Sequence, residues 1–337
     1  MDGSHDPAAE ATGASEGEAP GRVSRVIAMI NQKGGVGKTT TSVNLAAALA
    51  GAGRRTLLID LDPQAHASIH LGAEPGEERD TVYDLLDDPE SAEVSRLCRA
   101  RENLDVLPSE TDLAAAETEL TGLPDRNRRL RRALAALGGA HEFVIIDCPP
   151  SLGLLTINGL VAAREVIIPM QAHFLALQGV SKLLETVGLV RGSADEPGLN
   201  PSLRVTGVAL CMHDRQATHT QEVVEDLERF FAEAREQPDS PWRYARVLKP
   251  GIRRNIKLAE CPSFGQTIFE YAPTAAGAED YRALASNLIA EWDAMLERRA
   301  GHHARPRSAD PGSPPEIVVD PEPRAGAHAR HGLEGGA

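Results

Sequence analysis

The sequence predicts an α/β fold in which a doubly wound, mostly parallel sheet carries helices on both faces. Short apolar runs alternate with helical patterns along most of the chain, which is typical of such a sheet. The first run also leads through a glycine-rich turn directly into a helix. The chain has 337 residues, 42% of them apolar, which is enough for a substantial core. Strands are expected at residues 26–30, 56–59, 104–107, 143–146, 166–169, 205–210 and 244–248.

The loop after the first strand carries the most specific motif of the chain. Positions 31–40 read Asn-Gln-Lys-Gly-Gly-Val-Gly-Lys-Thr-Thr and run into an expected helix at residues 39–50. Glycines allow backbone amides to approach phosphate oxygens, a lysine adds positive charge, and a hydroxyl can bind Mg²⁺. The usual first glycine is replaced by Gln32, and Lys33 is an additional lysine. The predicted ATP contacts are Lys33, Gly34, Gly35, Val36, Gly37, Lys38, Thr39 and Thr40, with Thr39 on Mg²⁺ and both lysines catalytic.

Two carboxylates follow the second expected strand. Asp60 and Asp62 are two positions apart and should point the same way at the carboxyl end of that strand, where doubly wound sheets bind ligands. An Asp-Pro turn would explain Asp62 alone, but the phosphate loop on the first strand favours a functional interpretation. Asp60 is expected to support the loop and the Mg²⁺ shell.

A third carboxylate, Asp147, ends the apolar run at residues 143–146. A strand that ends in aspartate at this point can hold Mg²⁺, often through water. The following Pro149, Pro150 and Gly153 suit a loop that tightens on a γ-phosphate and relaxes after hydrolysis.

The later part of the chain is expected to contain two amphipathic helices, followed by a tail. Residues 220–236 have an apolar side, and a second stripe runs from Tyr281 to Met295 in a helix that Gly301 can end. Residues 1–21 and 301–337 lack apolar periodicity, so both tails should be disordered. One domain is therefore expected at residues 22–300.

Composition excludes several protein classes. The four cysteines lie far apart, which argues against a zinc site or a disulfide framework. No apolar run approaches the ~18 residues of a membrane span, and no secretion signal opens the chain, so a cytoplasmic protein is expected. The net charge of −14 does not exclude nucleic acid, because binding depends on local patches.

Together these motifs resemble the ParA/MinD family of ATPases, whose phosphate loop deviates in the same way. Residues 25–296 look like a short-type ParA partitioning ATPase, with further similar stretches at 106–109, 169–171 and 255–265. The resemblance implies an ATP-dependent homodimer in which Lys33 reaches the phosphates of the partner. Alternatively, Lys33 is a second cation for the ATP of its own subunit. Asp62 matches the position that orients or activates the attacking water.

The resemblance also implies a role on the nucleoid. The homodimer would bind double-stranded DNA without sequence preference, and a ParB-like partner would stimulate hydrolysis, so that chromosomes or plasmids are partitioned. The implied DNA contacts are Arg215, Arg253, Arg254 and Lys257, the last replacing an expected arginine. A second basic stretch, residues 126–132, has a helical apolar face and is interpreted as a solvated helix flank, with DNA contact left open.

Three other functions share the same core. A ParA-like ATPase could position a protein cargo, such as a chemoreceptor cluster or a microcompartment, and would differ only in its partner. A MinD-like membrane ATPase would need a basic amphipathic C-terminal helix, where this chain has a Pro/Gly-rich tail. An electron carrier resembling nitrogenase reductase would need cluster-ligating cysteines, whereas Cys148 lies in the expected switch loop and Cys98 is isolated.

Overall fold

The computed structural model describes residues 23–76, 79–172, 176–193, 196–214, 218–237 and 239–303. The chain divides into two compact units, Met1–Asp293 and Ala294–Ala337. In the second unit, only residues 294–303 are described, and they form the last turns of α11 (Ala276–His303). The helix therefore continues past Gly301, where the sequence predicts its end. The predicted tails otherwise lie outside the described residues.

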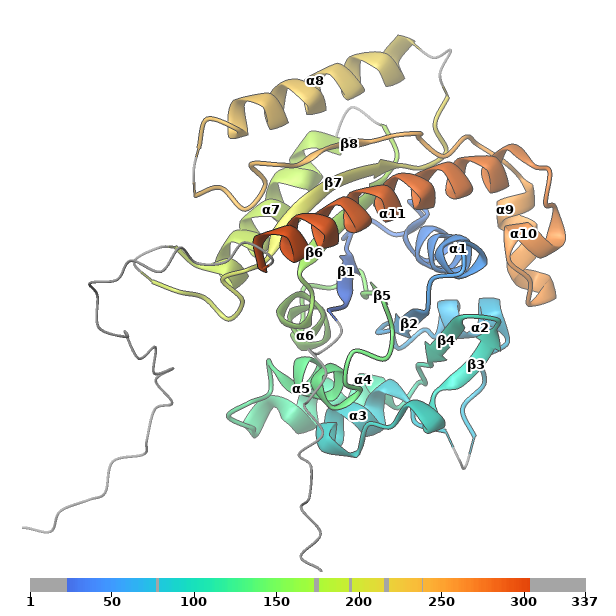
Figure 1. Cartoon of the computed structure of the whole chain (residues 1–337), viewed down its shortest axis with the longest axis vertical. Coiled ribbons are helices and arrows are strands. Elements are labelled where there is room, and N and C mark those ends of the chain that lie inside the picture. The colour runs from blue at the N-terminus through green and yellow to red at the C-terminus, as the bar shows by residue number, and fades with distance from the viewer. Residues whose placement is uncertain are drawn as a thin grey trace, which may run out of the picture. The chain divides into compact units, whose positions relative to one another are not determined.

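The first unit contains one eight-stranded sheet within its described residues (Figure 1). The strand order is β3-β4-β2-β5-β1-β6-β7-β8, and every pairing is parallel except that of β3 with β4. This confirms the predicted fold class. The strands are β1 (Arg25–Met29), β2 (Thr56–Asp60), β3 (Cys98–Arg101), β4 (Leu104–Leu107), β5 (Phe143–Asp147), β6 (Glu165–Met170), β7 (Arg204–Leu210) and β8 (Arg246–Leu248).

One strand was not predicted. β3 reads Cys-Arg-Ala-Arg and forms the antiparallel edge of a hairpin with β4. Its arginines break any apolar run, and the hairpin turns at Asn103, whose φ of 58° lies in the left-handed region. An edge strand can expose charged side chains, so the hydrophobic pattern used for the other seven strands does not detect it.

Helices cover both faces of the sheet. Figure 1 shows α5 and α6 on one face and α1 on the other. Besides the part of α11 up to Asp293, the described helices of the first unit are α1 (Lys38–Gly51), α2 (His66–Leu71), α3 (Val82–Asp87), α4 (Leu113–Glu119), α5 (Arg129–Ala136), α6 (Leu154–Ala162), α7 (Ala176–Arg191), α8 (Thr218–Ala234), α9 (Lys257–Glu260) and α10 (Ile268–Tyr271), with short 3₁₀ turns at Pro89–Ser91, Val94–Arg96, Leu120–Gly122 and Cys261–Phe264. Among the described residues, none of the helices is both long and apolar enough to cross a membrane.

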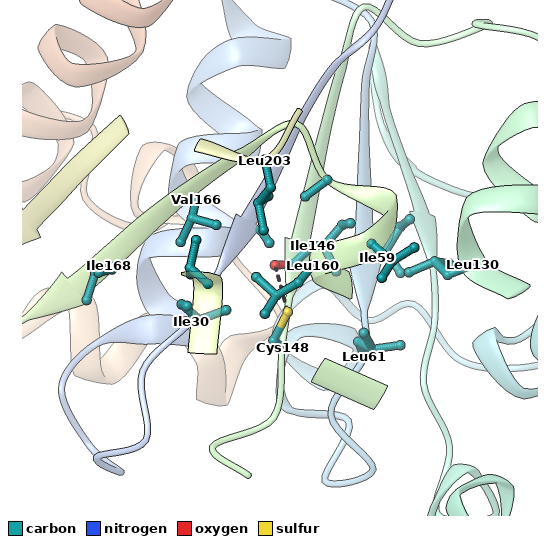
Figure 2. Close-up of a cluster of buried hydrophobic side chains, with 14 of the residues drawn as sticks. Ile30, Ile59, Leu61, Leu130, Ile146, Cys148, Leu160, Val166, Ile168 and Leu203 are labelled. Atoms are coloured by element: carbon teal, nitrogen blue, oxygen red, sulfur yellow. Dashed lines mark hydrogen bonds between the residues drawn. The ribbon is translucent and has the colours of Figure 1, made fainter. Parts of the chain in front are cut away.

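The core on the α5–α6 face is built from alternate strand residues. Figure 2 shows Ile59 and Ile146 facing Leu130 of α5 and Leu160 of α6. Cys148 lies inside this cluster, fully buried, with its Sγ 3.9 Å from the Ile146 carbonyl oxygen. Burial raises the pKa of the Cys148 thiol to about 12. This cysteine is therefore a core residue and gives no support to a cluster-ligating role.

The basic stretch at residues 126–132 differs from the expectation at one position. Arg129 is buried rather than solvated, and its guanidinium donates to the carbonyl oxygens of Leu86 and Asp87. It also lies 3.1 Å from Asp125. The last carbonyls of a helix have no intrahelical donor, so Arg129 satisfies the C-terminal end of α3. Arg128 and Arg131, in contrast, are exposed.

Candidate functional site

The phosphate loop occupies the turn between β1 and α1. Gly35 and Gly37 have φ values of 72° and 94°, a region that side chains with a Cβ rarely adopt. Gly37 is the N-cap of α1, which begins at Lys38 and has no acidic residue in its first turn. The amides of the first helical turn have no intrahelical acceptor and carry partial positive charge. This end of α1 is therefore suited to an anion, as the sequence predicts.

The Asp147 carboxylate, at the end of β5, accepts hydrogen bonds from three side chains of α1. Its Oδ1 accepts from Lys38 Nζ at 3.0 Å and from Ser42 Oγ at 2.7 Å. Its Oδ2 accepts from Thr39 Oγ1 at 2.7 Å. The structure thus places Lys38, the lysine predicted to bind phosphate, beside Thr39 and Asp147, which are predicted to bind Mg²⁺. Ser42 belongs to the same group but was not predicted, because it lies beyond the motif.

The Lys38–Asp147 pair is buried and charged. Asp147 has no exposed surface, and Lys38 is 9% exposed. Burial alone would lower the pKa of Lys38, but the Asp147 carboxylate holds that pKa above its ordinary value. Lys38 is therefore protonated at neutral pH, and its positive charge lines the cleft beside the phosphate loop, where it can bind a phosphate group.

Asp60 and Asp62 lie beside this pair. Asp60 faces Asp147 across the β2–β5 ladder and accepts from the amide and the hydroxyl of Ser68, both at 2.8 Å. Burial and then the charge of Asp147 raise the pKa of Asp60 to about 7. Asp62 is 8% exposed and accepts from the Gln64 amide at 3.1 Å. Asp60 is thus held by protein donors, while Asp62 stands at the edge of the cleft.

A cleft of about 690 Å³ joins these elements. It is lined by the phosphate loop, by Asp62 and Gln64, by Ala114 of α4, and by Pro149 and Ser151 of the loop after β5. Lys33 also lines it and is exposed, and only its backbone amide is fixed, by Asn31 Oδ1 at 2.8 Å. Among the described residues its ammonium group has no ion-pair partner, in contrast to Lys38.

A second cavity, of about 320 Å³, meets the first at the phosphate loop. Gly37 and Thr40 line both cavities. The walls of the second cavity come from Met212, Ile252 and Tyr281 among others, and they are largely apolar. The sequence did not predict these residues as part of the site. Their positions depend on packing between the end of β7, the loop before α9 and the start of α11, and no local motif marks them.

The predicted DNA contacts have different environments. Arg215 lies outside the described residues. The guanidinium of Arg253 lies 2.9 Å from both Glu279 and Asp280. Lys257 lies 2.8 Å from Glu260. Arg254 is exposed, and within the described part of the chain no acidic group pairs with it. Their role in DNA binding stays a prediction.

The site fits a nucleotide with its metal. The positive-φ glycines form a cradle at the N-terminus of a 14-residue helix, and the cleft beside it holds a buried cation. The Thr39 hydroxyl and the Asp147 carboxylate offer the hard oxygen ligands that Mg²⁺ prefers. The two oxygen atoms lie 2.7 Å apart. Thr39 and Asp147 would hold the metal, and Asp60 as a further ligand stays a prediction.

Comparisons with known proteins agree with this site. The model of a family described as an AAA domain matches residues 24–205. The sporulation initiation inhibitor protein Soj of Bacillus subtilis is 45% identical over 79% of this chain and 98% of its own length. The chromosome partitioning protein ParA of Myxococcus xanthus is 43% identical over 79% of this chain and 88% of its length.

Solved structures agree with the fold and the ligands. The cobyrinic acid a,c-diamide synthase of Mycobacterium smegmatis, with bound ADP and magnesium, is 38% identical with a TM-score of 0.64, and the match covers 80% of this chain and 96% of that one. Cyanothece McdA, in a complex with ATP, has a TM-score of 0.64 at 21% identity, which shows the fold alone. The protein uses ATP and Mg²⁺ and hydrolyses ATP to ADP and phosphate. It belongs to the Soj/ParA family of ATPases.

Proposed function

We propose that this chain is a nucleotide-dependent switch for partitioning chromosomes or plasmids. ATP favours a homodimer of the domain at residues 22–300, the dimer binds nucleoid DNA without sequence preference, and a ParB-like partner stimulates hydrolysis and release. The names of two curated relatives, chromosome partitioning proteins at 40% and 43% identity, favour this function. The solved structure named as a synthase is less similar, at 38%.

The contrast between two lysines carries the proposal. Lys38 is buried against Asp147, so its charge serves the phosphates of its own subunit. Lys33 lines the same cleft but is exposed, and no side chain of the described residues fixes its ammonium group. A free cation at the mouth of the cleft can reach the phosphates of a second copy placed opposite. ATP would then join the two subunits.

Hydrolysis is assigned to the other side of the cleft. Bound Mg²⁺ supplies positive charge to the β- and γ-phosphate oxygens. Asp62 lies at the cleft edge, where its carboxylate can orient a water molecule. The second cavity, with Met212 and Tyr281 in its walls and Arg254 beside them, is largely apolar and adjoins the phosphate loop, so we assign it to the adenine base.

The test is the oligomeric state of Lys33→Ala. Light scattering should show that ATP and Mg²⁺ double the mass of the wild-type protein, whereas Lys33→Ala should remain a monomer. Its nucleotide affinity should fall by no more than about tenfold, because the buried lysine remains. Lys182→Ala removes an exposed lysine on α7 and serves as the control. A Lys33→Ala protein that dimerises as well as wild type would disprove this arrangement.

A further inference from the structure

Helix α4 and the loop after β5 make a contact that the ATPase motifs do not include. Glu117 on α4 packs against Gly153, which is the N-cap of α6. A Cβ added at Gly153 would lie 2.2 Å from Glu117 Oε1 and 3.1 Å from its Cδ. Gly153 has an ordinary, negative φ of −80°, so its backbone conformation does not require glycine. A side chain at position 153 would therefore have to displace the carboxyl group of Glu117 from its present position.

The carboxyl group of Glu117 has an incomplete set of hydrogen bonds. Its Oε1 is buried, and among the described residues no donor lies within hydrogen-bond distance of it. A buried oxygen without a donor is unfavourable, and native proteins rarely keep one without a reason. The carboxyl group lies beside Gly153 at the start of α6, and this N-cap has no side-chain hydrogen bond. The first amides of a helix lack intrahelical acceptors and attract a negative charge.

The same loop borders the nucleotide cleft. Pro149 and Ser151 line the cleft together with Ala114, which lies one turn before Glu117 on α4. Ser151 is tied to α6, because its carbonyl oxygen accepts from Thr156 Oγ1 at 2.6 Å. This hydrogen bond links the cleft-lining part of the loop to the first turn of α6, which Glu117 contacts at Gly153.

We propose that Glu117 is a positioning residue for ATP hydrolysis. When residues 148–153 close on the γ-phosphate, Glu117 Oε1 receives an amide hydrogen from the first turn of α6, and this bond holds the loop closed. The contact stabilises the closed loop only when a γ-phosphate lies in the cleft, so it raises the affinity for ATP relative to that for ADP. Glu117 does not touch the reacting atoms and acts through the loop.

The test compares ATP with ADP in Glu117→Ala and Glu117→Gln. Loss of one charge-assisted hydrogen bond should lower kcat, and the ratio of ATP to ADP affinity, by about tenfold in Glu117→Ala. The affinity of Glu117→Ala for ADP should stay within about twofold of wild type. The kcat and the affinity ratio of Glu117→Gln should lie between those of wild type and Glu117→Ala. Glu119→Ala, on the same helix but bonded to Tyr83, is the control. If Glu117 had only a structural role, the substitution would lower Tm and weaken the binding of ATP and ADP equally. That result would overturn the proposal.

A double mutant tests whether the two residues act through one contact. Gly153→Ala should lose activity because its Cβ displaces the carboxyl group, while Gly122→Ala, whose added Cβ would meet nothing within 4 Å, should not. Gly153→Ala/Glu117→Ala should be no less active than Glu117→Ala, since the clash is gone. Losses that add in the double mutant would contradict a shared contact, as would wild-type kcat and nucleotide preference in both Glu117 variants.

Discussion

Lys38 Nζ lies 3.0 Å from Asp147 Oδ1, although 109 residues separate the two in sequence. The contact joins the start of α1 to the end of β5, and both side chains are buried. The lysine that we predict to bind phosphate and the carboxylate that we predict to hold Mg²⁺ therefore stabilise each other. Ser42 and Thr39 complete the hydrogen bonds of the carboxylate. A substitution here should affect binding and stability together.

Lys38→Ala should abolish binding of ATP with Mg²⁺ and also destabilise the fold. Removing one partner of a buried ion pair leaves an uncompensated charge and costs about 3–5 kcal/mol, of which Ser42 and Thr39 should offset a part. Thr39→Ala should also lose ATP with Mg²⁺ but cost only about 1 kcal/mol, since it removes a single hydrogen bond. Calorimetric titration and urea unfolding measure the two effects. An unchanged free energy of unfolding in Lys38→Ala would show that the pair is not structural.

Asp62→Ala should bind ATP and hydrolyse it slowly. Its carboxylate makes one backbone contact, to Gln64, so its loss should not disturb the phosphate loop. Loss of a group that orients or activates water should lower turnover by about 10²–10⁴-fold, and ATP-bound dimers should accumulate. Light scattering and phosphate release measure both. If Asp62→Ala stayed monomeric with ATP while wild type dimerised, its assigned role would be wrong.

The sequence predicts the parts of the site that lie on strand ends and in one continuous loop. Lys38, Asp62 and Asp147 each follow or end an apolar run, so their position at the carboxyl edge of the sheet follows from the pattern alone. The sheet order and the register of Asp60 with Asp147 need pairing between distant segments, which a single sequence does not specify.

The features that were missed depend on tertiary contacts. Arg129 is typical of a solvated helix flank until α3 places two free carbonyl oxygens beside it. Tyr281 was expected only as a helix core residue, yet it also lines the second cavity and its hydroxyl lies 3.0 Å from Thr41 Oγ1. Neither position has a local signal, because the partner is supplied by another element.

Glu165 should make stability depend on pH in the acid range. It is buried on β6, with one carboxylate oxygen 2.8 Å from Arg25 and the other 2.8 Å from Arg204. Burial alone would raise the pKa of Glu165, but the charge of Arg25 and the further partners bring it down to about 2. A folded-state pKa below the unfolded value of about 4.3 stabilises the protein above that pH, and this contribution is lost as the pH falls toward 2.

Comparison of Glu165→Gln with wild type isolates this effect. Near neutral pH the variant should be less stable by on the order of 3 kcal/mol, and the difference should shrink as the pH falls from about 4.5 toward 2. Urea unfolding at a series of pH values measures it, with Glu102→Gln, an exposed residue, as control. A stability difference that stays constant with pH would contradict the role of Glu165 as a buried anion.

Two adjacent arginines separate a structural from a DNA-binding role. Arg253 is held by Asp280 and Glu279, and its Nη2 also donates to the Ala276 carbonyl oxygen at 3.1 Å. It therefore fastens its loop to the start of α11. Arg254, the next residue, is exposed and has no acidic partner in the described part of the chain. Its charge is thus available to phosphate.

Arg254→Glu should abolish DNA binding and leave Tm unchanged, since within the described residues it belongs to no internal ion pair. Arg254 also lines the second cavity, so the DNA titration is made at saturating ATP, with dimerisation checked by light scattering. Arg253→Ala should instead lower Tm, and Arg55→Glu, an exposed arginine directly before β2, should show whether any surface charge reversal has the same effect. Phosphate contacts are indifferent to base sequence, and log K should fall by roughly 0.9 per log unit of salt for each contact. Anisotropy titrations on unrelated duplexes, with ATP and then with ADP, measure this. An ATP-dependent dimer presents twice as many phosphate contacts as a monomer, so equal DNA affinity with ATP and with ADP would contradict this surface. Wild-type DNA affinity in Arg254→Glu would contradict it as well.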